Sequence, residues 1–448
     1  MKLPSALSKD ASQRAALTRL VGLAACILIL APATHASEAF PWPTKTGPHR
    51  NGNADPEHAK GVPVSWDEET GENIAWRIAI EGTGHSTPVI GEGRIWLTSA
   101  TEDGTRQFVY CIDVQSGSVI HHKLLFENAN PEPLGNVINT YASPTCVLDG
   151  DAVYVHFGTY GTARLDAETA DVVWQRRDIN VRHFRGPGSS PVVVDGLVIL
   201  SFDGIDKQFL TALDAETGDT VWTTPRTTDF KDLDETGQPT REGDLRKAYS
   251  TPAIMEVAGR KQVVSVGSRA AFGYDLLTGK ELWTIEHDDY NAGTRPLPYG
   301  ETVIINTGSR NANLLRLRMD SSTRGNVTKS HELWNRPTGN SELPFPVLHG
   351  DRIYFVTDNG VATCIDALAG EEIWKKRIGG DYTASPIVAN GLVYFFDDQG
   401  KATIVRATDE YEVVAVNRLN EGMRSSPAIA YGALYLRSFD HLYKIAAN

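Results

Sequence analysis

The stretch "CIDALAGEEIW", residues 364–374, contains the pattern that decides the fold: an aspartate ends one apolar run, and a tryptophan lies in the next. Related stretches are "RLDAETADVVW", "ALDAETGDTVW" and "GYDLLTGKELW", which end at Trp174, Trp222 and Trp283. An aspartate in this position accepts backbone amide hydrogens of a tight turn, and the glycine that follows takes the left-handed conformation. The stretch is therefore one copy of an internal repeat.

Two further landmarks accompany this pattern along the chain. A proline that follows small or hydroxyl residues, as in "YASP" and "RSSP", marks the start of each unit. In each unit a turn glycine then separates two apolar runs, and these glycines recur at intervals of 41 to 63 residues. In "SPIVANGLVYFF" the Asn390-Gly391 pair is a strong hairpin signal. Both landmarks occur eight times, the prolines at positions 88, 144, 191, 252, 296, 346, 386 and 427.

Each unit is interpreted as four strands joined by a tight turn, a loop and a second tight turn. Four-stranded antiparallel units at this period predict an all-β fold, an eight-bladed β-propeller. The aspartate pattern is degenerate around Asp320 and Asp409, so seven blades are the alternative. The last unit ends after three strands, at "HLYKIAAN", whereas "ETGENIAW", ending at Trp76, resembles a missing fourth strand. We therefore expect the N-terminal strand to close the ring, which leaves no long sheet edge open.

The N-terminus has the layout of a secretory signal peptide. Basic residues precede the apolar run "LVGLAACILILA" (residues 20–31), and "PATHA" ends at Ala36. We expect cleavage near Ala36 and export to the periplasm or the medium, with a lipid anchor at Cys26 as the alternative. No later segment is long and apolar enough to span a bilayer. The predicted organisation is a signal peptide (1–36), an extension that packs on the propeller (37–72) and one propeller domain (73–448).

Charge and cysteine content restrict the partners and cofactors. A formal net charge of −13 makes nucleic acid and anionic lipid poor partners. Outside the signal region only Cys111, Cys146 and Cys364 remain, with no CxxC pattern. They are expected to be small buried strand residues, and a disulfide or metal site is the alternative.

The D-A-x-T-G-x-x-x-W unit with an S-S-P strand start resembles the pyrroloquinoline quinone (PQQ) repeat propellers, over residues 41–448. The opening "FPWPTKTGPHRNG" is similar to a secreted bacterial group of that family, and the resemblance extends to the propeller of the outer-membrane barrel-assembly lipoprotein. It implies that the tryptophans pack between blades and that the aspartates hold turns. The structural positions so implied are Trp76, Asp166, Trp174, Asp214, Trp222, Asp275, Trp283, Trp334, Asp366 and Trp374.

The resemblance also raises the question of catalysis. The quinoprotein dehydrogenases of this fold hold PQQ between a tryptophan and a disulfide of adjacent cysteines, with calcium beside a catalytic aspartate. This sequence has no adjacent cysteines, and "HDDYNAG" from His287 lacks the pattern of a calcium loop. We expect neither PQQ nor calcium, no metal site and no catalytic residue. A hydrolase or lyase built from residues distant in sequence remains open.

The parts of the chain that the repeat does not preserve are the candidates for function. The long loops precede the prolines, so they lie on one face of the predicted disc. The residue three positions before each proline also varies along the chain. We expect basic and aromatic residues there to form a pocket for an anionic or aromatic ligand, or a docking patch for a protein; ordinary solvated loop charges are the plain alternative. The candidates are His85, Tyr141, Arg182, His183, Arg185, Tyr249, Arg295, Tyr382 and Arg424.

The sequence therefore favours an exported, non-enzymatic propeller that acts as a binding or assembly scaffold in the cell envelope. Its partner would be an envelope protein or a small anionic or aromatic ligand. The alternatives are a PQQ-dependent dehydrogenase and another envelope enzyme with its site on the loop face.

Overall fold

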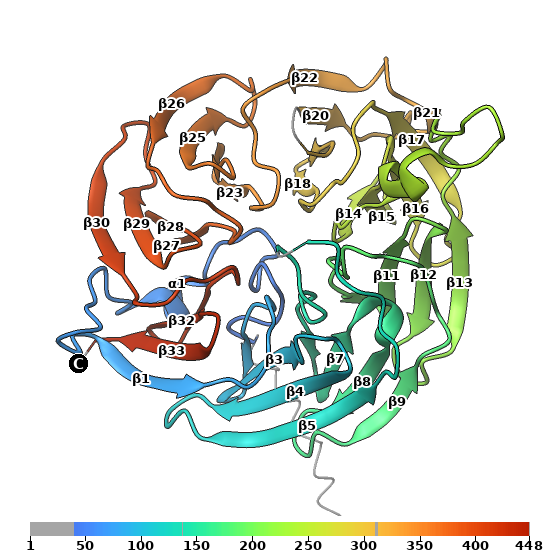
Figure 1. Ribbon diagram of the computed structural model, residues 1–448. Helices are drawn as coiled ribbons and strands as arrows, with labels where there is room; N and C mark the ends of the chain where they lie inside the picture. The colour runs from blue at the N-terminus through green and yellow to red at the C-terminus, as the bar shows by residue number, and fades with distance from the viewer. Residues whose placement is uncertain (1–39, 137, 310–311, 448) are drawn as a thin grey trace, which may run out of the picture. The chain divides into compact units, whose positions relative to one another are not determined.

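The computed structural model describes residues 40–136, 138–309 and 312–447, and the propeller unit is Ala39–Asn448. The predicted signal peptide, with Cys26, lies outside the described residues. Eight β-sheets form a ring (Figure 1), each with four antiparallel strands, and in the first seven blades these strands follow sequence order from the centre outward. The prediction of eight blades is confirmed, and the seven-bladed alternative is wrong.

The first four blades follow one another directly along the chain. Blade 4 has an additional two-residue strand, β21 (Gly325–Asn326), which pairs in parallel with its outermost strand. Blade 1 consists of β2 (Val89–Gly91), β3 (Arg94–Ala100), β4 (Arg106–Asp113) and β5 (Val119–Glu127); blade 2 of β6 (Val147–Asp149), β7 (Ala152–His156), β8 (Thr162–Asp166) and β9 (Val172–Arg176); blade 3 of β10 (Val192–Val194), β11 (Leu197–Asp203), β12 (Gln208–Asp214) and β13 (Thr220–Pro225); and blade 4 of β14 (Ala253–Val257), β15 (Arg260–Val266), β16 (Ala270–Asp275) and β17 (Glu281–Glu286).

The last four blades complete the ring. Blade 5 consists of β18 (Leu297–Tyr299), β19 (Thr302–Asn306), β20 (Leu314–Arg318) and β22 (Glu332–Arg336); blade 6 of β23 (Val347–His349), β24 (Arg352–Val356), β25 (Val361–Asp366) and β26 (Glu372–Arg377); blade 7 of β27 (Ile387–Ala389), β28 (Leu392–Phe396), β29 (Lys401–Arg406) and β30 (Val413–Arg418); and blade 8 of β31 (Ala428–Ala430), β32 (Ala433–Arg437), β33 (His441–Ala446) and β1 (Ile74–Ala79).

Blade 8 joins the two ends of the propeller. Its outermost strand is β1, which pairs with β33 in an antiparallel register from Ile74↔Ile445 to Ala79↔His441. The prediction that the N-terminal strand closes the ring is confirmed. Closure of this kind leaves no long unpaired edge between the first and last blades.

The repeat turns hold each blade and connect it to the next. In blade 3, Asp214 Oδ1 accepts hydrogen bonds from the backbone amides of Glu216 and Thr217, both at 2.9 Å. Trp174 of blade 2 packs on Gly218 of this turn, where an added Cβ would lie 2.7 Å from the indole. The indole Nε1 of Trp174 also donates to Ala215 O at 2.9 Å. A tryptophan in one blade and a turn in the next therefore form one seam.

The same indole bond to a carbonyl of the next blade recurs at Trp76, Trp222, Trp334 and Trp374. Trp283 differs, because its Nε1 donates to Gln262 within its own blade at 2.8 Å. The next blade is the one whose turn, around Asp320, departs from the repeat pattern. The apolar core is divided in the same way, into clusters that lie between neighbouring blades.

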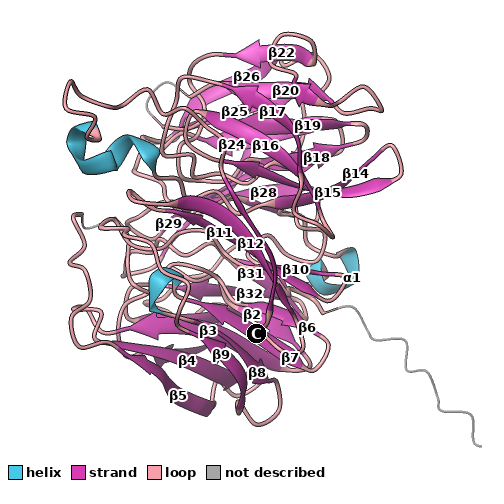
Figure 2. Ribbon diagram, turned by 90° about the vertical axis from the view of Figure 1, so that its right-hand side faces the viewer, coloured by secondary structure: helices cyan, strands magenta, loops and turns pink. Residues whose placement is uncertain are grey.

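The two faces of the propeller differ. The loops that precede the innermost strands, with η2 (Thr240–Arg246), form one face, which we call the loop face. The short helix α1 (Pro56–Ala59) lies on the opposite face. Figure 1 is viewed from the loop face, and Figure 2 shows η2 and α1 on opposite sides of the disc.

Residues 42–59, which we call the plug, enter the central channel from the opposite face. Trp42 pairs with Ile90 of blade 1, and Asn53 pairs with Val388 of blade 7. Between these bridges, Leu148 N donates to Pro43 O and Arg50 Nη2 donates to Val193 O. At its end, His58 O accepts from Gly432 N of blade 8. The plug therefore forms hydrogen bonds with the innermost strands of several different blades.

Candidate functional site

Three successive long loops of the loop face pack against one another. They connect blades 1 and 2, 2 and 3, and 3 and 4. Their interlocking side chains form a group that we call the rim cluster: Glu132, Tyr141, Arg182, His183, Phe184, Arg185, Asp244, Lys247 and Tyr249. Five of the nine predicted site residues belong to it.

Glu132 holds the first two loops together. Its carboxylate pairs with Arg182 at 2.9 Å and accepts the backbone amide of His183 at 3.0 Å. The Glu132 carbonyl accepts a hydrogen bond from Tyr141 Oη at 2.9 Å. The Tyr141 ring lies edge to face against Tyr160, with centroids 5.4 Å apart. The sequence offered no indication of the role of Glu132, because its partners lie about fifty residues away.

Asp244 plays the same part for the second and third loops. It forms an ion pair with Lys247 and lies 3.9 Å from Arg185 Nε. Both cations also lie over the ring of Phe184, at 4.9 Å for Arg185 and 5.6 Å for Lys247. The basic residues of the rim cluster therefore have carboxylate partners, so this surface does not present free positive charge.

His183 and Tyr249 connect the second loop to the third, with ring centroids 4.9 Å apart. Gly188, three residues before a proline, lies beneath Tyr249. A Cβ at this position would be 2.8 Å from Tyr249 Cδ1. The residue three positions before each proline varies along the chain, and at Gly188 the lack of a side chain makes room for the Tyr249 ring.

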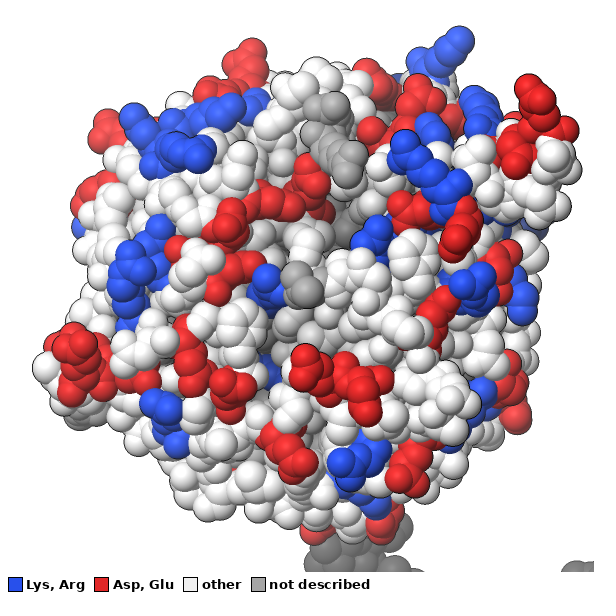
Figure 3. All heavy atoms as spheres, in the orientation of Figure 1, with Lys and Arg blue, Asp and Glu red and all other residues white. Residues whose placement is uncertain are grey.

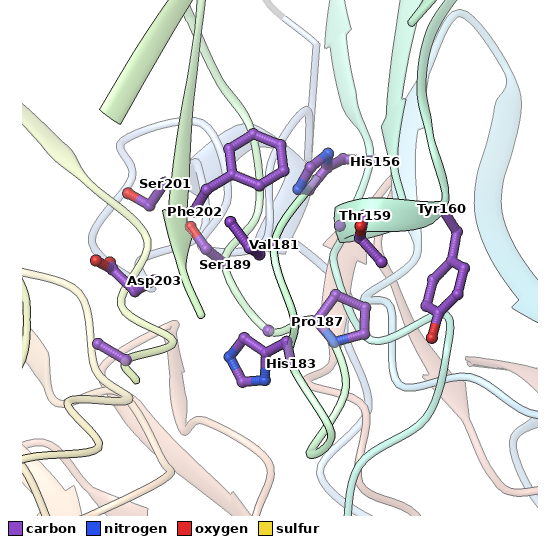
Figure 4. Close-up of a pocket in the computed structure, with 13 residues that line it drawn as sticks. His156, Thr159, Tyr160, Val181, His183, Pro187, Ser189, Ser201, Phe202 and Asp203 are labelled. Atoms are coloured by element: carbon purple, nitrogen blue, oxygen red, sulfur yellow. The ribbon is translucent and has the colours of Figure 1, made fainter. Parts of the chain in front are cut away.

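A cavity of about 30 Å³ lies under the rim cluster, between blades 2 and 3 (Figure 4). That is room for about two water molecules. Its lining includes His156, His183, Ser189, Ser201 and Asp203. Among the described residues, neither the buried hydroxyl of Ser189 nor that of Ser201 has a protein hydrogen-bond partner.

The two histidines of this cavity are held neutral. Burial lowers the pKa of His156 to about 3 and that of His183 to about 4. His156 Nδ1 lies 2.8 Å from Thr162 Oγ1. Asp203 forms a bidentate ion pair with Arg226, with both N–O distances 2.6 Å and both side chains almost fully buried. The cavity is thus polar, and it is too small for a cofactor-sized ligand.

The predicted residues His85 and Arg424 lie at the mouth of the channel on the loop face. Arg424 Nε pairs with Asp398 at 3.0 Å, and Thr383 donates to the same carboxylate at 3.1 Å. Burial, with the nearby charges of Arg437, Arg424 and Lys45, lowers the pKa of His85 to about 3. This imidazole is therefore a neutral group at the edge of a positively charged channel.

The last two predicted residues lie elsewhere. Tyr382 is 1 % exposed in the apolar cluster between blades 6 and 7, so it is not on a binding surface. Arg295 is 6 % exposed inside the channel, where it contacts the plug. Sequence reasoning missed its neighbours Lys45 and Arg50. The only signal that could have found them is the run of basic residues in "TKTGPHR".

Apolar side chains are also exposed on the loop face. Ile138 is 46 % exposed and Phe439 is 41 % exposed. Arg424 lies close to both, because its Nη1 approaches Ile138 O at 3.5 Å and its guanidinium lies 5.8 Å from the centre of the Phe439 ring. Acidic and basic side chains are interspersed over the rest of this face (Figure 3).

The residues that could hold PQQ and calcium do not fit that purpose. Cys111, Cys146 and Cys364 are buried and free. Cys111 and Cys146 lie in the apolar cluster between blades 1 and 2, and Cys364 lies in the cluster between blades 6 and 7. Among residues 40–136, 138–309 and 312–447, no group of three or more His, Cys, Asp or Glu is placed to hold a metal ion. In the same ranges no helix is long and apolar enough to cross a membrane.

Comparisons with known proteins agree with this architecture. The chain is similar to BamB from Moraxella catarrhalis (12 % identity, TM-score 0.56), covering 83 % of this chain and 99 % of that one. It is also similar to a europium-containing methanol dehydrogenase (12 %, 0.71), covering 91 % and 98 %, and to the quinohemoprotein alcohol dehydrogenase from Comamonas testosteroni (14 %, 0.65), covering 93 % and 82 %. At these identities the likeness concerns the fold alone. No curated protein matches the sequence.

One family model, described as outer membrane protein assembly factor BamB, matches residues 58–201, 109–245, 206–324 and 325–424. These matches span most of the propeller and follow its repeats. The resemblance to the PQQ-repeat propellers is thereby confirmed, and the chain belongs to the family of outer membrane protein assembly factor BamB.

Proposed function

We propose that this protein is an exported, non-enzymatic propeller that binds a partner protein of the cell envelope through its loop face. The family description supports a role in assembly. The signal-peptide pattern at the N-terminus supports export. The proposal assigns no cofactor and no chemistry to the protein.

The observation that carries the proposal is the platform on the loop face. Loops of this length would ordinarily be variable and mobile. Here three of them are fixed to one another through Glu132 and Asp244. A rigid platform of this kind lowers the entropy that a binding surface loses when a partner docks.

The chemistry of the surface favours a protein partner over a small anionic ligand. The rim cations have carboxylate partners, and the cavity below them has room for about two water molecules. Ile138 and Phe439 instead expose apolar groups beside the Arg424–Asp398 pair. An apolar centre with a polar rim is the arrangement that protein interfaces use.

The proposal is tested by placing a charge on this surface. Ile138→Asp, alone or with Phe439→Ser, should weaken co-purification of a defined envelope partner at least tenfold, because it buries a carboxylate in the interface. Leu277→Asp is the matched control: Leu277 is 67 % exposed in a turn on the opposite face. Equal retention of the partner by both variants would exclude the loop face as the binding surface.

The quinone-dependent dehydrogenase remains the alternative, and it is tested separately. The purified protein is titrated with PQQ and calcium while the absorbance of the quinone is followed. We expect no saturable binding, because no adjacent cysteines and no calcium ligand set are present among the described residues. Stoichiometric binding with dye-linked oxidation of an alcohol would replace the proposed function with this one.

A further inference from the structure

The central channel holds cationic side chains that have no carboxylate beside them. Three such residues form one electropositive region inside a chain of formal net charge −13. Among the described residues, none of the three forms an ion pair within 4 Å. They are Lys45, Arg50 and Arg295, which line one cavity.

Arg295 is the most deeply placed of the cations that meet the plug. It is 6 % exposed, and both of its hydrogen bonds go to backbone carbonyls. Nε donates to Pro252 O at 3.1 Å, and Nη1 donates to Arg50 O. Burial, followed by the charge of Arg50, lowers the pKa of Arg295 to about 9. A carbonyl accepts a hydrogen bond but does not neutralise the charge of a guanidinium.

The plug adds two more cations to the same place. Arg50 Nη2 donates to Val193 O at 2.8 Å, and Asp149 acts on it only from beyond ion-pair distance. Lys45 Nζ lies 4.3 Å from the centre of the Phe345 ring. Burial lowers the pKa of Lys45 to about 8. Closing the channel with this segment therefore adds positive charge beside Arg295.

Three arginines elsewhere in the propeller are buried together with carboxylates, whereas the buried Arg437 donates to Ser86 Oγ and Thr98 O. Arg226 has Asp203, Arg246 has Asp232, and Arg164 has Glu216 and Asp151. Such pairing is the general rule, because an isolated buried charge is strongly destabilising. The channel departs from this rule at several neighbouring positions at once, which indicates a missing counter-charge.

A cavity is present where that counter-charge belongs. It measures about 20 Å³, and its lining includes Lys45, Arg50 and Arg295 together with the hydroxyl residues Ser190 and Thr251. A second cavity of about 10 Å³ shares Arg50 and Arg295. The larger one has room for one or two particles the size of a water molecule. A single halide ion fits this space, whereas a quinone or a nucleotide does not.

We propose that this cavity binds one small monovalent anion, chloride, between Arg295 and the plug residues Arg50 and Lys45. The ion supplies the negative charge that the described part of the channel lacks. Since Arg295 belongs to blade 5 and the other two residues to the plug, the ion fixes the plug in the channel. This site is separate from the loop face and does not depend on the proposed function.

Thermal unfolding of the purified protein tests the proposal. Chloride should raise the unfolding temperature in a saturable way when it replaces gluconate, which is too large for the cavity, at constant ionic strength. A ligand that binds only the folded state gives a rise of about 3 °C at a hundredfold excess over its Kd. Arg295→Gln should reduce this rise to less than about 1 °C. Arg164→Gln, which removes a paired arginine, should keep it.

Equal chloride effects in the wild type and in Arg295→Gln would overturn the proposal, as would no effect in the wild type. A direct measurement covers the case in which the variant does not fold. Crystals of the wild type grown in sodium bromide should show an anomalous difference peak beside Arg295 and Arg50. Peaks confined to the protein surface would overturn the site.

Discussion

The rim cluster and the central channel both gather basic residues in an acidic protein, but they treat the charge in opposite ways. In the rim cluster, Arg182 has Glu132, and Arg185 and Lys247 share Asp244. In the channel, Arg295 and Arg50 contact carbonyl groups. The first arrangement forms a rigid surface of paired charges that suits a protein partner, and the second forms an internal site for an anion.

The two regions differ in where their interacting residues lie in the sequence. The rim carboxylates lie on the same loops as the cations or on adjacent loops, so charge can be balanced locally. The channel cations come together only when the N-terminal plug meets blade 5, and Arg50 and Arg295 are 245 positions apart. The negative charge that balances these cations therefore has to come from a group other than the side chains beside them.

The largest change in the free energy of unfolding is expected when a buried arginine loses its carboxylate partner and is left unpaired, like the arginines of the channel. Asp203→Ala removes the carboxylate of Arg226 and leaves a fully buried guanidinium alone. The free energy of unfolding should fall by about 3–5 kcal/mol, the usual loss when one partner of a buried pair is removed. Denaturant unfolding measures it. A loss below about 1 kcal/mol would mean that buried arginines here do not need carboxylates, and the contrast with the channel would lose its meaning.

A second expected effect separates the two regions by pH. His156, under the rim cluster, has a folded pKa of about 3 against 6.5 unfolded. Between pH 6.5 and 4 the unfolded chain binds the extra proton, so the free energy of unfolding should fall as the pH falls, by about 3 kcal/mol from this residue. His156→Gln should reduce the slope in this window by the contribution of one proton, while the other buried histidines, among them His85 and His183, still contribute. An unchanged slope would show that His156 is not held neutral.

Lys45, in the channel, acts in a different window. Its pKa is about 8 in the folded protein against 10.5 unfolded. Between these values the unfolded chain again binds more protons, so its contribution to stability should increase as the pH rises from 8 to 10. The same denaturant titrations with Lys45→Met should lack that increase. A rise of equal size in the variant would assign the effect to other groups.

A smaller loss is expected from disturbing the seat of the plug. Gly52 has a φ of +83°, and an added Cβ would lie 2.6 Å from Val347 Cγ2. Gly52→Ala should lower the free energy of unfolding by about 2 kcal/mol, from backbone strain and overpacking together. Gly61→Ala is the matched control, since Gly61 has a φ of +87° with open space around it. Equal losses in both variants would mean that the plug is not tightly seated.

The smallest effect is expected at the surface of the rim cluster. Arg182 is 60 % exposed, and its pair with Glu132 is accessible to solvent and salt. Arg182→Gln should change the free energy of unfolding by less than about 1 kcal/mol. A loss of 3 kcal/mol, measured in the same way as for Asp203→Ala, would show that the two kinds of pair are not distinct.

Much of the fold could be predicted from the sequence, because each blade repeats the same local chemistry. Asp214 and its turn, Trp174 and its seam, and the closing strand after Gly71 each follow from a pattern that occurs several times. The degenerate turns near Asp320 and Asp409 explain why the sequence left seven blades as an alternative.

The site was less accessible to sequence reasoning, because its contacts do not repeat. The placement of His183 beside Tyr249 depends on how two loops fold together. The same is true of the carboxylates that neutralise the rim, and of the meeting of Arg50 with Arg295. Tyr382 shows the converse, since an aromatic residue near a strand start is here part of the core.

Photo-crosslinking in intact cells tests the central claim, binding through the loop face, most directly. A photoreactive amino acid is placed at Ile138 or Phe439 on the loop face, and at Leu277 or Leu368 on the opposite face, all of them exposed. The expected result is one discrete adduct with an envelope protein from the first two positions and none from the others. An adduct formed only from the opposite face would contradict the claim.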